Sequence, residues 1–384
     1  MRTRGQPYAE AAVRAIVAGG LHAVLLVGPP SVGKATLALD LAALLMCSAE
    51  ADRRPCGECR GCHLVASGNH PDIHRLRPEG PGGQVRIEQV RSLATELSLL
   101  PVEAGARVAI VEAAHRLNED AQNALLKTLE EPPSGVTIVL CADDEERLLP
   151  TVRSRCARIR LGPVSTREIE ALLDDLALAD PPRAARLARL AGGRPGLAVA
   201  YASAHDAALA RGEIARGLLD LASTGPAARL VTIRQLHARA MSAATALASS
   251  DADPGSATVR RPRGRLRPSS APAVAASDGE VEDADADAAG GRKTSAFERR
   301  RGAAWLIDVW REVARDLSVL EIGQRRAVRD VESLEELEAV AGRLSPGAAT
   351  SFLGALERAG ERLDANGSPE LLLDVLALRW PRVA

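Results

Sequence analysis

Four cysteines lie close together in the sequence, at a spacing that suits a metal ion. The cysteines of this pattern, C-x8-C-x2-C-x2-C, are Cys47, Cys56, Cys59 and Cys62. Because C-x2-C steps let neighbouring thiolates converge on one ion, four of them complete a closed tetrahedral zinc shell without an open position. Disulfides are the alternative, which the tight spacing and a cytosolic location disfavour. The pattern predicts a structural zinc module over residues 47–62, with His63 and His70 as rival ligands.

A second group of residues could hold phosphate. The stretch GPPSVGKAT follows a short apolar run and precedes a helical pattern, which is the strand-turn-helix context of a P-loop. Backbone N–H groups and the following helix N-terminus then hold the phosphates, and the lysine reaches the terminal ones. The candidate nucleotide-binding residues of this stretch are Gly28, Pro29, Ser31, Gly33, Lys34, Ala35 and Thr36. A Gly-rich turn around a buried lysine, without any ligand, is the alternative.

Two positions of this candidate site lack side chains that ATP hydrolysis needs. Ala35 stands where a Ser or Thr hydroxyl normally binds Mg²⁺, and Thr36 points about 100° further round the helix. The apolar run 108–111 ends in Glu112, a further candidate for the nucleotide site, but Ala113 follows where a second acid is expected. We therefore expect ATP to bind weakly or not at all, and we expect a poor ATPase or none. The sequence does not decide whether Mg²⁺ binds.

Apolar runs alternate with helical patterns in the first part of the chain. The runs 22–27, 108–111 and 136–140 are typical of buried parallel strands, and helical patterns such as 118–131 separate them. This alternation predicts an α/β fold with a parallel sheet. From residue 165 onward only helical patterns occur.

These changes in pattern predict three domains. Residues 1–164 are expected to form the α/β nucleotide-binding-like domain with the zinc module, 165–205 a small helical lid, and 206–384 an all-α domain. Within the last, 251–293 combines Pro, Gly, Ser and Ala with a basic and an acidic block, which predicts a disordered insertion. A contact of the basic block 260–267 with DNA or an acidic partner is the alternative.

The overall composition excludes several classes of protein. The chain has 384 residues, of which 46% are hydrophobic and 26% charged, so it can bury a large core. Because 49 basic residues nearly cancel 50 acidic ones, no overall field attracts nucleic acid or membrane. Aromatic residues are only 2%, which argues against a platform for stacked bases. The absence of a signal-like start or a run of bilayer length leads us to expect a cytoplasmic location and no membrane partner.

Several longer motifs together resemble a bacterial clamp-loader subunit of the AAA+ class. They are IEQVR at 87–91, ARVAIV at 106–111, NALLKTLEEPP at 123–133 and SRC at 154–156. The stretch GNHPDI at 68–73 and the loss of the acid at Ala113 resemble the delta-prime subunit of DNA polymerase III more than the motor subunit called gamma or tau. The resemblance is strong over roughly residues 5–200.

This resemblance implies a fold, partners and roles for two arginines. The fold would be an AAA+ P-loop domain, a lid and an all-α collar, within a ring that opens a sliding clamp and places it on primed DNA using ATP. The implied partners are the gamma/tau and delta subunits, the clamp and, through the complex, primed DNA. Arg155 would be an arginine finger that completes the ATP site of a neighbouring subunit, since a guanidinium beside a γ-phosphate stabilises the transition state. Arg194 would be a second nucleotide sensor.

The resulting expectation is a non-motor clamp-loader subunit of DNA replication. The sequence shows no residues for polymerase chemistry, although membership of the polymerase holoenzyme would classify the chain with DNA-directed DNA polymerases. One alternative is an ATP-hydrolysing motor subunit of the gamma/tau type. The other is a zinc-containing nucleic-acid-binding module outside any ring.

Overall fold

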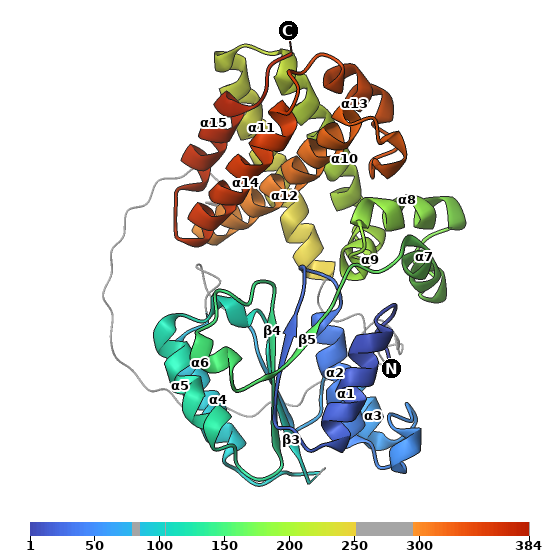
Figure 1. The fold of residues 1–384 in the computed structure, drawn as a ribbon, viewed down its shortest axis with the longest axis vertical. Helices are drawn as coiled ribbons and strands as arrows, with labels where there is room; N and C mark the ends of the chain where they lie inside the picture. The colour runs from blue at the N-terminus through green and yellow to red at the C-terminus, as the bar shows by residue number, and fades with distance from the viewer. Residues whose placement is uncertain (79–84, 104, 251–294, 384) are drawn as a thin grey trace, which may run out of the picture.

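The computed structural model describes residues 1–78, 85–103, 105–250 and 295–383 (Figure 1). An α/β part forms one end of the molecule and a stack of helices forms the other. The disordered insertion predicted at 251–293 lies outside the described residues. Within the described part, no helix is long and apolar enough to cross a membrane.

A parallel sheet of five strands forms the centre of the α/β part, in the order β2-β3-β4-β1-β5. The strands are β1 (Ala23–Val27), β2 (Ile73–Leu76), β3 (Arg107–Val111), β4 (Val136–Ala142) and β5 (Ala157–Arg160). The three central strands are the apolar runs expected from the sequence, since a strand covered on both faces is apolar along its length. The edge strands β2 and β5 were not expected. Their sequences, IHRL and ARIR, are short and mix charged with apolar side chains.

Helices cover both faces of the sheet (Figure 1). The helices of this part are α1 (Pro7–Ala18), α2 (Lys34–Met46), η1 (Ala51–Arg53), α3 (Arg60–Ala66), α4 (Ile87–Leu97), η2 (Ala114–Arg116), α5 (Glu119–Glu130) and α6 (Pro150–Arg153). Alternate strand residues face opposite ways. Leu25 therefore packs in the core beneath α4 and α5, whereas Leu26 packs in the core beneath α1 and α2.

The helix expected over 118–131 is confirmed, and the structure gives the reason for its limits. Asn118 precedes α5, and its Oδ1 accepts a hydrogen bond from the backbone N–H of Ala121 at 2.9 Å, which satisfies a donor of the first turn. The helix ends at Glu130, shortly before Pro132 and Pro133, which cannot continue a helical hydrogen-bond ladder.

The rest of the described chain is helical, as the sequence predicted. Its helices are α7 (Thr166–Asp175), α8 (Pro181–Ala191), α9 (Pro195–Ser203), α10 (His205–Asp220), η3 (Leu221–Ser223), α11 (Pro226–Ser250), α12 (Ala296–Glu321), η4 (Arg325–Ala327), α13 (Leu334–Ala341), α14 (Ala348–Asp364) and α15 (Pro369–Arg379). One hydrophobic core runs from Val164 through these helices to Trp380. At its far end the rings of Trp310, Phe352 and Trp380 pack with centroids 4.8 to 5.5 Å apart.

A buried group of charges joins α10 and the start of α9 to α12. Arg211 of α10 pairs with Glu312 of α12 at 3.2 Å and with Asp330 in the segment between η4 and α13. Arg194, just before α9, pairs with the same Glu312 at 2.5 Å. Because these partners come from distant parts of the chain, the network connects α10 and the residue before α9 to α12 and to the segment before α13.

Candidate phosphate cradle and metal centre

The loop of residues 28–33 lies at the carboxyl end of β1 and leads into the N-terminus of α2. Gly28 donates its N–H to the carbonyl of Ala142 at 3.2 Å, and a Cβ at Gly28 would meet the carbonyl oxygen of Leu161 at 2.5 Å. Gly33, the residue before α2, has a φ of 108°, which side chains rarely allow. The loop thus has the strand-turn-helix geometry expected of a phosphate cradle, with a helix N-terminus after it.

The lysine of this cradle is fully engaged within the chain. The side chain of Lys34 is 9% exposed, and its Nζ donates to the carbonyls of Gly28 at 2.8 Å and Pro29 at 2.6 Å. The third partner is Asp143, whose Oδ1 lies 2.6 Å from Nζ. Two donors of the ammonium group thus have backbone acceptors, and the ion pair with Asp143 neutralises its charge.

The other residues expected around a nucleotide contribute little towards a metal ion. Ser31 is exposed, whereas Ala35 and Thr36 are half-buried in the first turn of α2. Glu112 follows β3, but its Oε1 lies 2.7 Å from the Nη2 of Arg75 and 3.1 Å from the Nε of Arg77. The expected carboxylate is therefore present and already neutralised by two arginines at the edge of the sheet.

His115 lies beside Asp143 and is kept neutral at pH 7. Its Nδ1 accepts the backbone N–H of Asp143 at 3.1 Å, and its Nε2 lies 3.7 Å from Asp143 Oδ2. Burial lowers the pKa of His115 below its ordinary value, and the Asp143 carboxylate offsets part of that effect. The imidazole thus holds the backbone at the end of β4 without adding a positive charge.

The backbone at the start of α9 contacts the cradle, whereas the side chain of Arg194 does not. The N–H of Gly196, in the first turn of α9, donates to the carbonyl of Ser31 at 2.9 Å. The Arg194 guanidinium instead pairs with Glu312 at 2.5 Å and donates from Nε to the Ala191 carbonyl at 3.0 Å. In this arrangement the expected sensor arginine connects the lid to α12.

Arg155 lies just beyond α6, and its partners belong to α5 and α6. Its Nη2 lies 2.5 Å from Oε1 of Glu130, and its Nη1 donates to the Thr151 carbonyl at 3.0 Å. The side chain is 37% exposed and its partner 48% exposed. Arg158 is similar in type but pairs with Glu145 at 3.0 Å. Arg155 thus lies on the surface of the chain.

The four cysteines meet as the sequence predicted. Their sulfur atoms all lie within 4.8 Å of one another, and Cys47 Sγ is 3.6 Å from that of Cys56 and 3.8 Å from that of Cys59. A tetrahedral zinc with Zn–S bonds of about 2.3 Å requires sulfur separations of about 3.8 Å. The donor set and its spacing therefore fit a structural zinc ion. His63 is exposed and His70 Nδ1 accepts the N–H of Asp72, so neither expected rival joins the cluster.

Backbone groups around the cluster favour thiolates. The N–H of Cys59 points at Cys56 Sγ at 3.3 Å, and that of Cys62 points at Cys59 Sγ at 3.4 Å. Burial raises the pKa of Cys59, but hydrogen bonds from Cys62 and Ser48 outweigh it and lower the pKa to about 5. Burial raises the pKa of Cys62 to about 12. All cysteines of the chain are free thiols, so no disulfide competes for the cluster.

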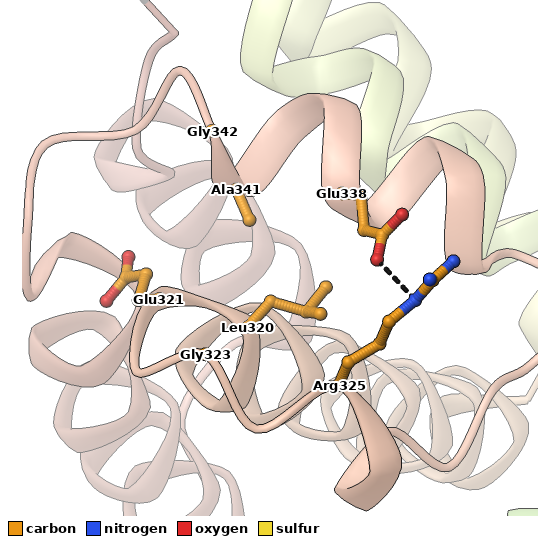
Figure 2. Close-up of a pocket in the computed structure, with 7 residues that line it drawn as sticks. All are labelled: Leu320, Glu321, Gly323, Arg325, Glu338, Ala341 and Gly342. Atoms are coloured by element: carbon orange, nitrogen blue, oxygen red, sulfur yellow. Dashed lines mark ion pairs between the residues drawn. The ribbon is translucent and has the colours of Figure 1, made fainter.

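A separate hollow of about 330 Å³ lies in the helical part, between α12 and α13 (Figure 2). Its lining residues are Leu320, Glu321, Gly323, Arg325, Glu338, Ala341 and Gly342. Arg325 pairs with Glu338 at 2.7 Å, and the carboxylate of Glu321 accepts the N–H of Gly347 at 3.1 Å. Because its charged side chains already have partners, the hollow offers little to a charged ligand.

Sequence reasoning missed several partners that define the cradle. Arg75 and Arg77, which hold Glu112, belong to or follow a strand that was not expected. The P-loop motif does not indicate Asp143, which the structure places 2.6 Å from Lys34. Its position directly after the central strand β4 was the available indication, because residues at the carboxyl ends of neighbouring parallel strands meet.

The parallel sheet, the Gly-rich loop after the central strand β1 and the helix that follows this loop define an α/β domain with the strand-turn-helix arrangement of a P-loop. Residues 15–165 match the family described as DNA polymerase III, delta subunit. The expected relationship is thereby confirmed for the α/β part of the chain.

Individual relatives agree with this family. The chain is 40% identical over 177 residues to DNA polymerase III subunit delta' of Pseudomonas aeruginosa, covering 45% of this chain and 53% of that protein. It is 36% identical over 197 residues to the Escherichia coli subunit delta', covering 51% and 59%. Subunit tau of Escherichia coli is 33% identical over 177 residues, covering 45% and 27%. The chain thus spans somewhat more than half the length of these two delta' relatives.

Proposed function

We propose that this chain is a non-motor, delta-prime-type subunit of the DNA polymerase III clamp loader. In this role it assembles with gamma/tau and delta subunits into a ring that places a sliding clamp on primed DNA. Residues 1–164 would form the AAA+ domain, 165–205 the lid and 206–384 the collar. The proposal is supported by the similarity to subunit delta' and by the chemical state of the cradle.

The observation that carries the proposal is that the charged groups of the cradle are already paired within the chain. Lys34 donates to two backbone carbonyls and pairs with Asp143, and Glu112 is held by Arg75 and Arg77. Ala35 supplies no hydroxyl to Mg²⁺. ATP therefore binds weakly or not at all, no defined place remains for Mg²⁺, and the AAA+ domain serves as a scaffold.

Arg155 would be the catalytic contribution of the subunit, acting on ATP bound by its neighbour. An exposed ion pair such as that with Glu130 is worth only about 0–1 kcal/mol, so a γ-phosphate can replace the carboxylate at little cost. Arginine fingers supplied in trans accelerate phosphoryl transfer by about 10³–10⁵. A scaffold with a poor site of its own can thus still determine the turnover of the ring.

Cys47, Cys56, Cys59 and Cys62 would hold a structural zinc ion. Four thiolates close the coordination sphere, so the ion supplies no reactive position. Its role is to fix the segment between the end of α2, where Cys47 lies, and the start of α3, where Cys59 lies.

A clamp-loading assay tests the proposal against the motor alternative. A clamp loader assembled without this chain should fail to load the clamp on primed DNA, and the wild-type chain should restore loading. Lys34→Ala should restore it as well, because the lysine of a scaffold subunit does not act on ATP. Loss of loading by a folded Lys34→Ala variant would favour a motor subunit, and undiminished loading without the chain would refute membership of the ring.

A further inference from the structure

We propose that Asp143 is a built-in substitute for phosphate, which closes the cradle to nucleoside polyphosphates by holding Lys34. The carboxylate supplies the negative charge that the terminal phosphate of a nucleotide would otherwise bring to the lysine. This inference concerns the chain alone and does not depend on the ring. It gives a second cause for weak nucleotide binding. Besides the side-chain groups missing at Ala35 and Ala113, a negative charge opposes the phosphates.

The sheet fixes the position of Asp143. Strand β4 runs parallel to β1, with Val27 opposite Ala142, and the N–H of Gly28 donates to the Ala142 carbonyl. The residue after Ala142 therefore lies beside the first residue of the cradle. The ring of His115, whose side chain is 7% exposed, accepts the backbone N–H of Asp143 and holds it there. The contact with Lys34 thus follows from strand register.

The contact also neutralises the charge of the lysine. The carbonyls of Gly28 and Pro29 each accept a hydrogen bond from Nζ of Lys34, and Asp143 Oδ1 forms an ion pair with it at 2.6 Å. A phosphate oxygen that approaches this ammonium must replace the carboxylate or lie beside it, and the two carry charge of the same sign. Polyphosphate is thus disfavoured by competition for the ammonium and by repulsion.

Among the described residues, no other carboxylate is paired with Lys34. Glu112 follows the neighbouring strand β3, but its carboxylate is held by Arg75 and Arg77. Asp144, next to Asp143, points its Oδ1 at the N–H of Glu146 at 2.9 Å. The side chain of Asp143 is 37% exposed, so an asparagine of the same shape fits without opening a cavity. The chain therefore offers both a test position and a matched control.

Fluorescent ATP and ADP analogues, titrated into the purified full chain and followed by anisotropy, test this inference. Asp143→Asn removes the carboxylate charge that competes with phosphate for the Lys34 ammonium, so its affinity should exceed that of the wild type about tenfold or more. Adding Lys34→Ala to this variant should abolish the gain. Asp144→Asn removes the same charge one residue away and should bind like the wild type.

Two results would overturn the inference. One is equal affinity of wild type and Asp143→Asn, including no binding by either. The other is an equal gain in Asp144→Asn, which would indicate a general charge effect. Thermal unfolding establishes that the variants are folded, and Asp143→Ser replaces Asp143→Asn if the latter is not. Reductive methylation followed by mass spectrometry gives a readout without nucleotide: Lys34 should react faster once Asp143 is neutral. Clamp loading by Asp143→Asn tests the proposed function separately from this inference. A wrong prediction for nucleotide affinity leaves the proposed function standing, and a failure of clamp loading leaves this inference standing.

Discussion

Replacing Arg211 by methionine should destabilise the helical part of the chain far more than the loss of a surface ion pair. Arg211 is 2% exposed and is the cation shared by the carboxylates of Glu312 and Asp330. Methionine fills a similar volume but removes the positive charge, so both buried carboxylates lose a cation that pairs with them. The same change at Arg239 is the control, since its pair with Glu213 is 40% and 54% exposed.

The contacts that survive set the size of the effect. Removing one partner of a buried ion pair costs about 3–5 kcal/mol. Glu312 keeps Arg194, and Asp330 keeps the hydroxyl of Ser333 at 3.1 Å, so we expect the lower end, about 3 kcal/mol. An exposed pair contributes about 0–1 kcal/mol, which is the range expected for Arg239→Met.

Urea unfolding followed by tryptophan fluorescence measures this difference. The three tryptophans of the chain, Trp305, Trp310 and Trp380, all lie buried in the helical part, so the emission reports its unfolding. With a denaturant slope of about 1–3 kcal/mol per M, the midpoint should fall by about 1 M or more in Arg211→Met. Equal midpoints for Arg211→Met and Arg239→Met would refute the reasoning that the buried charges hold these helices together.

Two further predictions concern the metal centre and the cradle. The purified chain should contain about one zinc ion per chain, measured by a colorimetric chelator. Cys59→Ser should lose this zinc and thermal stability, whereas Cys156→Ser, which lies outside the cluster, should keep both. Equal zinc content in the two variants would contradict the assignment. Burial lowers the pKa of His115 in the folded chain, so below about pH 6.5 the unfolded chain binds the proton more readily and stability falls. His115→Gln should flatten the decline of unfolding free energy between about pH 6.5 and 5, and an unchanged or steeper slope would argue against a buried neutral imidazole.

The sequence was sufficient wherever a local pattern carries the structure. The central strands are continuous apolar runs, α5 has a capping asparagine and a proline stop, and the cysteine spacing alone indicated a shared site. The edge strands β2 and β5 escaped prediction because half-exposed strands of four residues have no distinctive pattern. Local rules thus predicted elements and one ligand set.

The electrostatic partners could not be predicted in this way. Lys34 meets Asp143 because β1 and β4 are adjacent in the sheet, and Arg194 meets Glu312 because the lid packs on α12. Both contacts depend on tertiary arrangement, which residue spacing does not encode. The P-loop motif therefore indicated the strand, turn and helix, whereas the partners of Lys34 required the three-dimensional structure.

Steady-state ATP hydrolysis by the reconstituted ring tests the central claim most directly. The ring contains gamma/tau and delta subunits, clamp and primed DNA, and the chain is wild type, Arg155→Ala or Arg158→Ala. Arg158 is also exposed and ion-paired, so its replacement controls for the loss of a surface arginine. The account predicts that Arg155→Ala lowers turnover, that Arg158→Ala does not, and that the isolated chain hydrolyses no ATP. Unchanged turnover with Arg155→Ala, or brisk hydrolysis by the isolated chain, would contradict it.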